Sequence, residues 1–221
     1  MPASIVLLHG LGRTYRSMLP IARAAEARGY RVLNVAYPSR TAPIEALAER
    51  VAHEAQAFAG AFDAHERAHF VTHSLGGILL RAAVAAGLLP LDRVGRAVML
   101  APPNQGSELP DALGGRPLLG PLYRQVTGPA GAQLGTGPAG VPARLPPVEF
   151  ELGVIAGSRS LNPLLSRYIE GPDDGKVSVG RAAVPGMRDF LVVPHSHTFL
   201  MRAPAVVEQV LHFLERGAFA R

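Results

Sequence analysis

The segment from Phe70 to Leu80 constrains the fold of this chain more than any other part of the sequence. It reads Phe-Val-Thr-His-Ser-Leu-Gly-Gly-Ile-Leu-Leu, which is an apolar run typical of a buried strand, then a serine, two glycines and a run that favours a helix. A serine at a sharp strand-to-helix turn forms a nucleophile elbow, which exposes the hydroxyl beside the first N–H of the helix. The pattern therefore predicts an α/β fold with Ser74 as a candidate nucleophile. The alternative is a serine that only caps the helix.

The rest of the hydrophobic pattern alternates between strand-like and helix-like segments. Short apolar runs predict strands at residues 4–8, 31–36, 68–72, 96–101, 150–156 and 190–193, with a short extended piece at 177–179. Helical spacing of apolar residues predicts helices at 17–28, 43–59, 75–86, 118–126, 163–169 and 205–216. This alternation predicts a minimal, mostly parallel sheet of about six strands with helices on both faces. We see no repeat and no second domain, so we expect one domain over residues 1–221.

Residues 102–148 interrupt this alternation. They are rich in glycine and proline, and only residues 118–126 show helical spacing. A long irregular segment inside a domain is usually a functional loop or lid, and here it follows a strand end, where α/β folds place their sites. We expect a lid whose apolar residues, Leu118 and Leu122 among them, contact an acyl chain. The alternative is an insertion without a role.

Composition excludes several classes of protein. The chain has 221 residues, 48% hydrophobic and 18% charged, which is typical of a globular protein. It has no cysteine, so it forms no disulfide and no cysteine metal site. No apolar stretch approaches the roughly 20 residues of a membrane-spanning helix. The first predicted strand begins almost at Met1, which leaves no room for a signal peptide, so we expect a cytoplasmic protein.

The basic character of the chain does not indicate a nucleic-acid partner. The formal net charge is +5 and the sequence pI is about 10.2. The arginines are scattered, Lys176 is the only lysine, and we find no basic run with interleaved aromatic residues. We therefore expect a small-molecule partner and no nucleic acid. The sequence does not predict an oligomeric state.

Acyl transfer by a serine also needs a base, an acid that orients the base, and N–H donors for the oxyanion. Candidate acids are Asp173 and Asp174 in a turn-rich loop, and candidate bases are His195 and His197 after the last predicted strand. An H-x-H pair is also found in metal sites, but no strong ligand pattern accompanies it, so we expect no metal and no cofactor.

The loop after the first predicted strand reads His9-Gly10-Leu11-Gly12. A loop at this place can lie beside the elbow, where the backbone N–H groups of Leu11 and Leu75 would bind the oxyanion. The same glycines also fit the start of a dinucleotide-binding loop. That interpretation is weaker because Tyr15 stands where the third glycine is needed, and no acidic residue ends the second strand.

These motifs resemble those of the α/β-hydrolase family, and within it the small bacterial lipases and esterases, over nearly the whole chain. The resemblance rests on four segments, Leu8-His9-Gly10, Thr72 to Gly77, Asp174-Gly175-Lys176-Val177 and His197 to Met201. It implies a triad of Ser74, His197 and Asp174 in the order serine, acid, histidine. It favours Asp174 because the acid of many lipases precedes glycine directly, and His197 because two apolar residues follow it closely. We also expect His9 and His73 to contact the substrate.

The resemblance implies that the protein hydrolyses a small-molecule carboxylic ester through an acyl-enzyme on Ser74. An acyltransferase or a thioesterase would use the same nucleophile, and a binding protein on this fold would use none. Both alternatives stay open at this point. One departure from the family pattern is Thr72, because a small residue usually stands two positions before the nucleophile.

Overall fold

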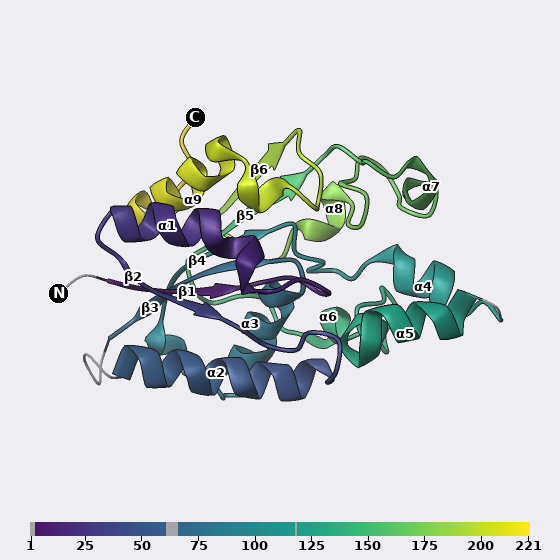
Figure 1. The fold of residues 1–221 in the computed structure, drawn as a ribbon, viewed down its shortest axis with the longest axis horizontal. Helices are drawn as coiled ribbons and strands as arrows, with labels where there is room; N and C mark the ends of the chain where they lie inside the picture. The colour runs from purple at the N-terminus through teal and green to yellow at the C-terminus, as the bar shows by residue number, and fades with distance from the viewer. Residues whose placement is uncertain (1–2, 61–65, 118) are drawn as a thin grey trace.

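The computed structural model describes residues 3–60, 66–117 and 119–221, which form a six-stranded sheet between two layers of helices (Figure 1). The strands are β1 (Ser4–Leu8), β2 (Arg31–Val35), β3 (Ala68–His73), β4 (Val94–Leu100), β5 (Leu152–Gly157) and β6 (Asp189–Val193). They lie in the order β2-β1-β3-β4-β5-β6, and every neighbouring pair is parallel. The prediction of a parallel sheet of about six strands is therefore confirmed.

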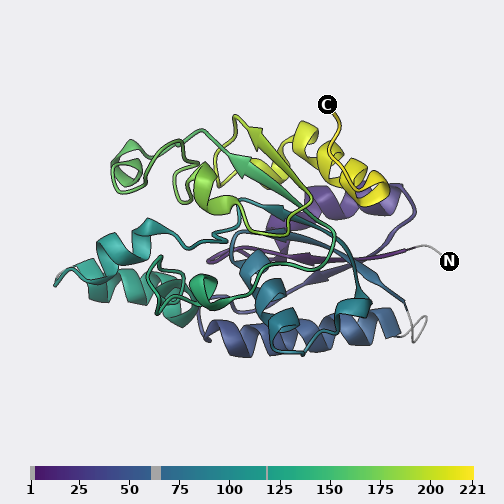
Figure 2. The same cartoon turned by 180° about the vertical axis from the view of Figure 1, so that it is seen from behind.

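Helices cover both faces of the sheet. α1 (Leu19–Ala27) and α9 (Pro204–Arg216) pack on one face, while α2 (Ile44–Gly60) and α3 (Leu75–Ala85) pack on the other (Figures 1 and 2). Alternate residues of β1 point to opposite faces. Ile5 and Leu7 join the core under α1 and α9, while Val6 and Leu8 join the core under α2 and α3. Burial on both faces explains why the central strands are continuous apolar runs.

Residues 102–148 form helices instead of the expected irregular segment. They contain α4 (Glu108–Gly114), α5 (Leu119–Ala132) and α6 (Val141–Arg144), whereas the sequence predicted one helix; Leu118 lies outside the described residues. The glycines and prolines fall at caps and kinks. Gly128 has φ 67° directly before Pro129, and a Cβ there would lie 1.9 Å from the Arg40 carbonyl oxygen. The kink in α5 lies at this Gly-Pro pair, and the close approach of the Arg40 backbone leaves no room for a side chain at residue 128.

Short elements connect the larger ones. They are η1 (Tyr15–Met18), η2 (Leu91–Arg93), α7 (Pro163–Ser166), α8 (Val179–Ala182) and η3 (Leu200–Arg202). Of the extended piece expected at residues 177–179, Ser178 is extended and forms an isolated bridge with Asp173, whereas Val179 already begins α8, because Ser178 accepts a hydrogen bond from the Arg181 N–H. None of the helices in the described part of the chain is long and apolar enough to cross a membrane.

The strand order leaves a crevice at the carboxyl end of the sheet. β1 and β3 are neighbours, although β2 lies between them in the sequence. The chain leaves β1 toward one edge of the sheet and β3 toward the other, so the loops after these two strands diverge. Helices α4, α5 and α7 lie beyond this end of the sheet (Figure 1).

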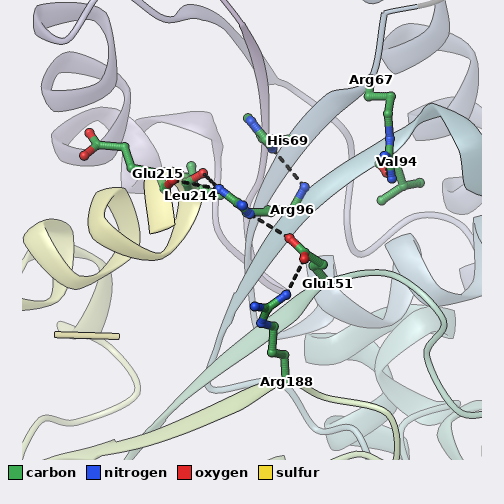
Figure 3. Close-up of polar contacts among 8 residues, drawn as sticks. All are labelled: Arg67, His69, Val94, Arg96, Glu151, Arg188, Leu214 and Glu215. Atoms are coloured by element: carbon green, nitrogen blue, oxygen red, sulfur yellow. Dashed lines mark hydrogen bonds and ion pairs between the residues drawn. The ribbon is translucent and has the colours of Figure 1, made fainter. Parts of the chain in front are cut away.

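Charged residues connect the strands at the opposite, amino-terminal end of the sheet (Figure 3). The Arg96 guanidinium donates to the Glu151 carboxylate over 2.7 Å, and Arg188 forms a second ion pair with the same carboxylate. Arg96 also donates to the carbonyl oxygens of Leu214 and Glu215, over 2.9 and 2.8 Å. These carbonyls end α9, so Arg96 holds the last turn of that helix against the sheet.

Candidate active site

Ser74 occupies the single position between β3, which ends at His73, and α3, which begins at Leu75. Its backbone has φ 51° and ψ −118°, a region that residues other than glycine rarely adopt. Such a conformation costs about 1–3 kcal/mol and persists only when the surroundings hold it. Here the Ser74 N–H donates to the Leu100 carbonyl over 2.9 Å. The side chain makes no capping hydrogen bond to α3, so Ser74 does not act as a simple N-cap.

The glycines after Ser74 let α3 start directly against the sheet. A Cβ on Gly76 would lie 2.6 Å from the Leu8 carbonyl oxygen, which is far inside van der Waals contact. A Cβ on Gly77 would lie 3.0 Å from the Met99 sulfur and 3.3 Å from the Thr72 hydroxyl oxygen. The bulk of Thr72, fully buried, is therefore accommodated by the missing side chain of Gly77.

Asp174 and His197 form a buried hydrogen-bonded pair. The His197 Nδ1–H donates to Asp174 Oδ2 over 2.8 Å, and the two side chains are 4% and 1% exposed. The backbone joins the same loops, because the His197 N–H donates to the Asp174 carbonyl over 3.0 Å. The second carboxylate oxygen accepts from the N–H groups of Lys176 and Val177. These bonds fix the tautomer of His197 and leave Nε2 as the nitrogen available to act as a base.

The competing acid and base point elsewhere. Asp173 accepts hydrogen bonds from the Ser166 hydroxyl and the Gly175 N–H, over 2.8 and 2.7 Å, and so stabilises its own turn. His195 lines a separate surface depression with Phe199. The resemblance, and not the spacing of the residues, distinguished these pairs in the sequence.

Ser74 and His197 line one cavity of about 300 Å³ beside helices α4 and α5. Its apolar wall comes largely from the 102–148 segment and includes Leu109, Pro110, Leu113, Tyr123, Val126 and Leu134. Burial raises the pKa of Tyr123 to about 12, so this side chain stays uncharged. Leu122 is exposed and does not line the cavity.

The loop after β1 lies against the elbow. A Cβ on Gly10 would lie 2.6 Å from His73 Nδ1 and 3.2 Å from the Ser74 Cβ. Leu11 lines the cavity. Within the described residues, the N–H groups of Leu11 and Leu75 have no hydrogen-bond partner. These two N–H groups are therefore candidate donors for an oxyanion.

His73 and His9, both expected to contact the substrate, lie in different places. His73 lines the cavity, and its Nε2–H donates to the His197 carbonyl over 3.0 Å. Burial, with a further contribution from His197, lowers the pKa of His73 well below its usual value, so the ring is neutral. His9 does not line the cavity. Its ring stacks on the Tyr37 ring with the two ring centroids 4.0 Å apart, and its Nδ1–H donates to the Gly10 carbonyl. His9 therefore stabilises the loop after β1 without lining the cavity.

The sequence reasoning did not assign the two charged residues of the cavity, Arg13 and Lys176, to the site. Both lie two positions after a residue that the motifs had singled out, Leu11 and Asp174. Lys176 is also the only lysine of the chain. These two signals were present in the sequence, but the meeting of the two side chains in one cavity depends on the fold.

A sequence model of the alpha/beta hydrolase family matches residues 5–212. The chain belongs to the alpha/beta hydrolase family. A comparison with curated protein sequences found no match.

Solved structures similar to this alpha/beta hydrolase include a Bacillus licheniformis lipase. Its propeptide form has a TM-score of 0.81 at 19% identity over 100% of this chain and 52% of that chain. The mature form has a TM-score of 0.77 at 19% identity over 96% and 92% of the two chains. A phospholipase from Legionella pneumophila has a TM-score of 0.71 at 15% identity, and the match covers 98% of this chain and 60% of the phospholipase chain. This chain therefore spans about half the length of the propeptide form and nearly all of the mature form. At these identities the likeness establishes the fold.

Proposed function

We propose that this protein is a serine carboxylic-ester hydrolase of the esterase or lipase type, with Ser74, His197 and Asp174 as its catalytic triad. The observation that carries the proposal is the buried Asp174–His197 pair in the cavity that Ser74 enters from a strained turn. The lipase and esterase neighbours agree with this reaction class.

The proposed reaction uses the groups described above. The Ser74 hydroxyl attacks the ester carbonyl carbon while His197 Nε2 takes its proton, and the N–H groups of Leu11 and Leu75 bind the oxyanion. The tetrahedral intermediate collapses and expels the alcohol, which receives the proton from His197. A water molecule then attacks the acyl-enzyme and gives a proton to His197. Release of the acid returns that proton to Ser74.

The apolar wall indicates where the acyl chain binds. Helices α4 and α5 supply most of this wall, and the rest of the segment 102–148 supports them. We assign this segment the role of a lid over the acyl chain. Its buried side chains, such as Leu109 and Leu134, would exclude water from the ester bond.

The test is covalent labelling with a fluorophosphonate, followed by intact-mass measurement and peptide mapping. We expect one adduct, on Ser74, absent in Ser74→Ala and strongly slowed in His197→Ala. Hydrolysis of para-nitrophenyl esters should fall by about 10⁴- to 10⁶-fold in Ser74→Ala. His195→Gln and Asp173→Asn are matched controls, since both side chains lie outside the cavity, and they should retain labelling. A folded wild-type protein that neither labels nor hydrolyses any ester would contradict the proposal.

A further inference from the structure

The cavity beside Ser74 holds two cationic side chains, Arg13 and Lys176. None of the described residues that line it is acidic. The remaining wall is formed by apolar residues, serines, a threonine, a tyrosine and two histidines. A purely apolar ester would need no such charges, and two unneutralised cations beside an apolar wall raise the free energy of the empty site.

Backbone hydrogen bonds anchor the two loops that carry these side chains. The Lys176 N–H donates to Asp174 Oδ1 over 3.0 Å, and its carbonyl accepts from the Ser107 hydroxyl over 2.8 Å. The Arg13 N–H closes a turn onto the Gly10 carbonyl over 3.1 Å. Neither charged side chain forms an ion pair or a hydrogen bond with any described residue. The charges are therefore positioned by the loops and not neutralised by them.

The two cations affect each other and the residues around them. Lys176 is exposed as a whole, but partial burial of its ammonium lowers its pKa, Arg13 lowers the pKa further, and Asp174 raises it. Asp174 does not neutralise Lys176, because its carboxylate already accepts three hydrogen bonds, from the His197 ring and from two backbone N–H groups. Two like charges in a partly dry cavity attract an anion strongly.

We propose that the substrate carries an anionic group, a carboxylate or a phosphate, beside its apolar acyl chain, and that Arg13 and Lys176 bind this group. The inference rests on the ester hydrolysis proposed for the same site. An anion would neutralise both cations at once, while the acyl chain packs against α4 and α5. Arg13 offers a planar pair of donors and Lys176 a point charge, which together suit the oxygens of either group.

The kinetic test uses three esters of equal acyl length. They are para-nitrophenyl hexanoate, the same ester with a carboxylate on the nitrophenyl ring, and the para-nitrophenyl monoester of adipic acid. The variants are Arg13→Gln and Lys176→Met, with Arg16→Gln as the control, because Arg16 is exposed and lies outside the cavity. We expect the wild type to prefer at least one anionic ester in kcat/KM. That preference should fall about ten-fold in either cavity variant and persist in the control.

A binding test needs no turnover. Calorimetry would compare octyl phosphate with octanol for the same four proteins. We expect octyl phosphate to bind about ten-fold more weakly to Arg13→Gln and Lys176→Met than to the wild type or to Arg16→Gln. Circular dichroism melts would show whether the variants stay folded.

The outcomes separate the two proposals. Ser74-dependent hydrolysis with no preference for either anionic ester, or with the same preference in all variants, would overturn the anion site and leave the esterase proposal standing. An absence of hydrolysis together with Arg13-dependent binding of octyl phosphate would remove the esterase proposal and retain the anion site.

Discussion

The substitution Gly76→Ala tests how closely α3 must approach the sheet. The added Cβ would lie 2.6 Å from the Leu8 carbonyl oxygen and 2.9 Å from the Leu8 Cβ. Both are atoms of a buried central strand, so no rotation of a flexible side chain relieves the overlap. The helix must move outward by several tenths of an ångström or the strand must bend. Such overpacking costs about 1–3 kcal/mol, and we expect the upper part of that range here.

Two further glycines make the test quantitative. A Cβ on Gly77 would meet the flexible Met99 sulfur at 3.0 Å, so Gly77→Ala should cost less. A Cβ on Gly180 would have nothing within 4 Å, so Gly180→Ala should be neutral or stabilising. Urea unfolding followed by circular dichroism gives the order, and the rate of fluorophosphonate labelling shows whether the elbow has moved. If Gly76→Ala is as stable as Gly180→Ala, the close contact at the elbow is refuted.

Three further predictions concern stability. Arg81 is buried and donates to three backbone carbonyls, including that of Pro146, so Arg81→Met should lower the free energy of unfolding by about 2–4 kcal/mol in urea titrations; a loss below about 0.5 kcal/mol would contradict this. The hydrogen bond from Arg96 lowers the pKa of Glu151 from 4.5, so its ion pairs stabilise the fold above that pH and are lost in acid. Because the carboxylate is 42% exposed, Glu151→Gln should cost less than about 1 kcal/mol at neutral pH and nothing in strong acid; equal losses at both pH values would argue against it. Burial lowers the pKa of the three histidines His9, His69 and His73. The unfolded chain therefore takes up protons first, and stability should fall below pH 6.5 by up to about 1.4 kcal/mol per pH unit for each histidine, whereas a flat profile from pH 7 to 5 would be inconsistent.

The strands were predictable because their burial pattern is local. Ile5 to Leu8 are apolar at every position because both faces of β1 are covered. A continuous apolar run of this length therefore predicts a buried strand from the sequence alone. The elbow was predictable for a similar reason, because its strand, serine, glycines and helix are contiguous.

The helices of the 102–148 segment were not predictable in the same way. Gly128 and Pro129 indicate a break, and the helix is interrupted at Gly128, but a second helical stretch follows directly, where the Arg40 backbone lies against Gly128. That contact joins residues far apart in the sequence. Arg13 and Lys176 were missed for the same reason, since each is unremarkable in its own loop and only the fold brings them to one cavity.

The polar groups at the two ends of the sheet differ in burial and in what their loss would cost. At the amino-terminal end, Glu151 is neutralised by Arg96 and Arg188 near water, where each pair contributes little and the loss of one is tolerated (Figure 3). At the carboxyl end, the Asp174 carboxylate is buried and accepts three hydrogen bonds, so the loss of one donor leaves an unsatisfied oxygen lone pair in a poorly solvated site. The same loop that supplies two of those donors also presents Lys176 to the cavity. Stabilisation of the acid and selection of an anionic substrate would therefore depend on one short turn, so variants of this loop should change stability and specificity together.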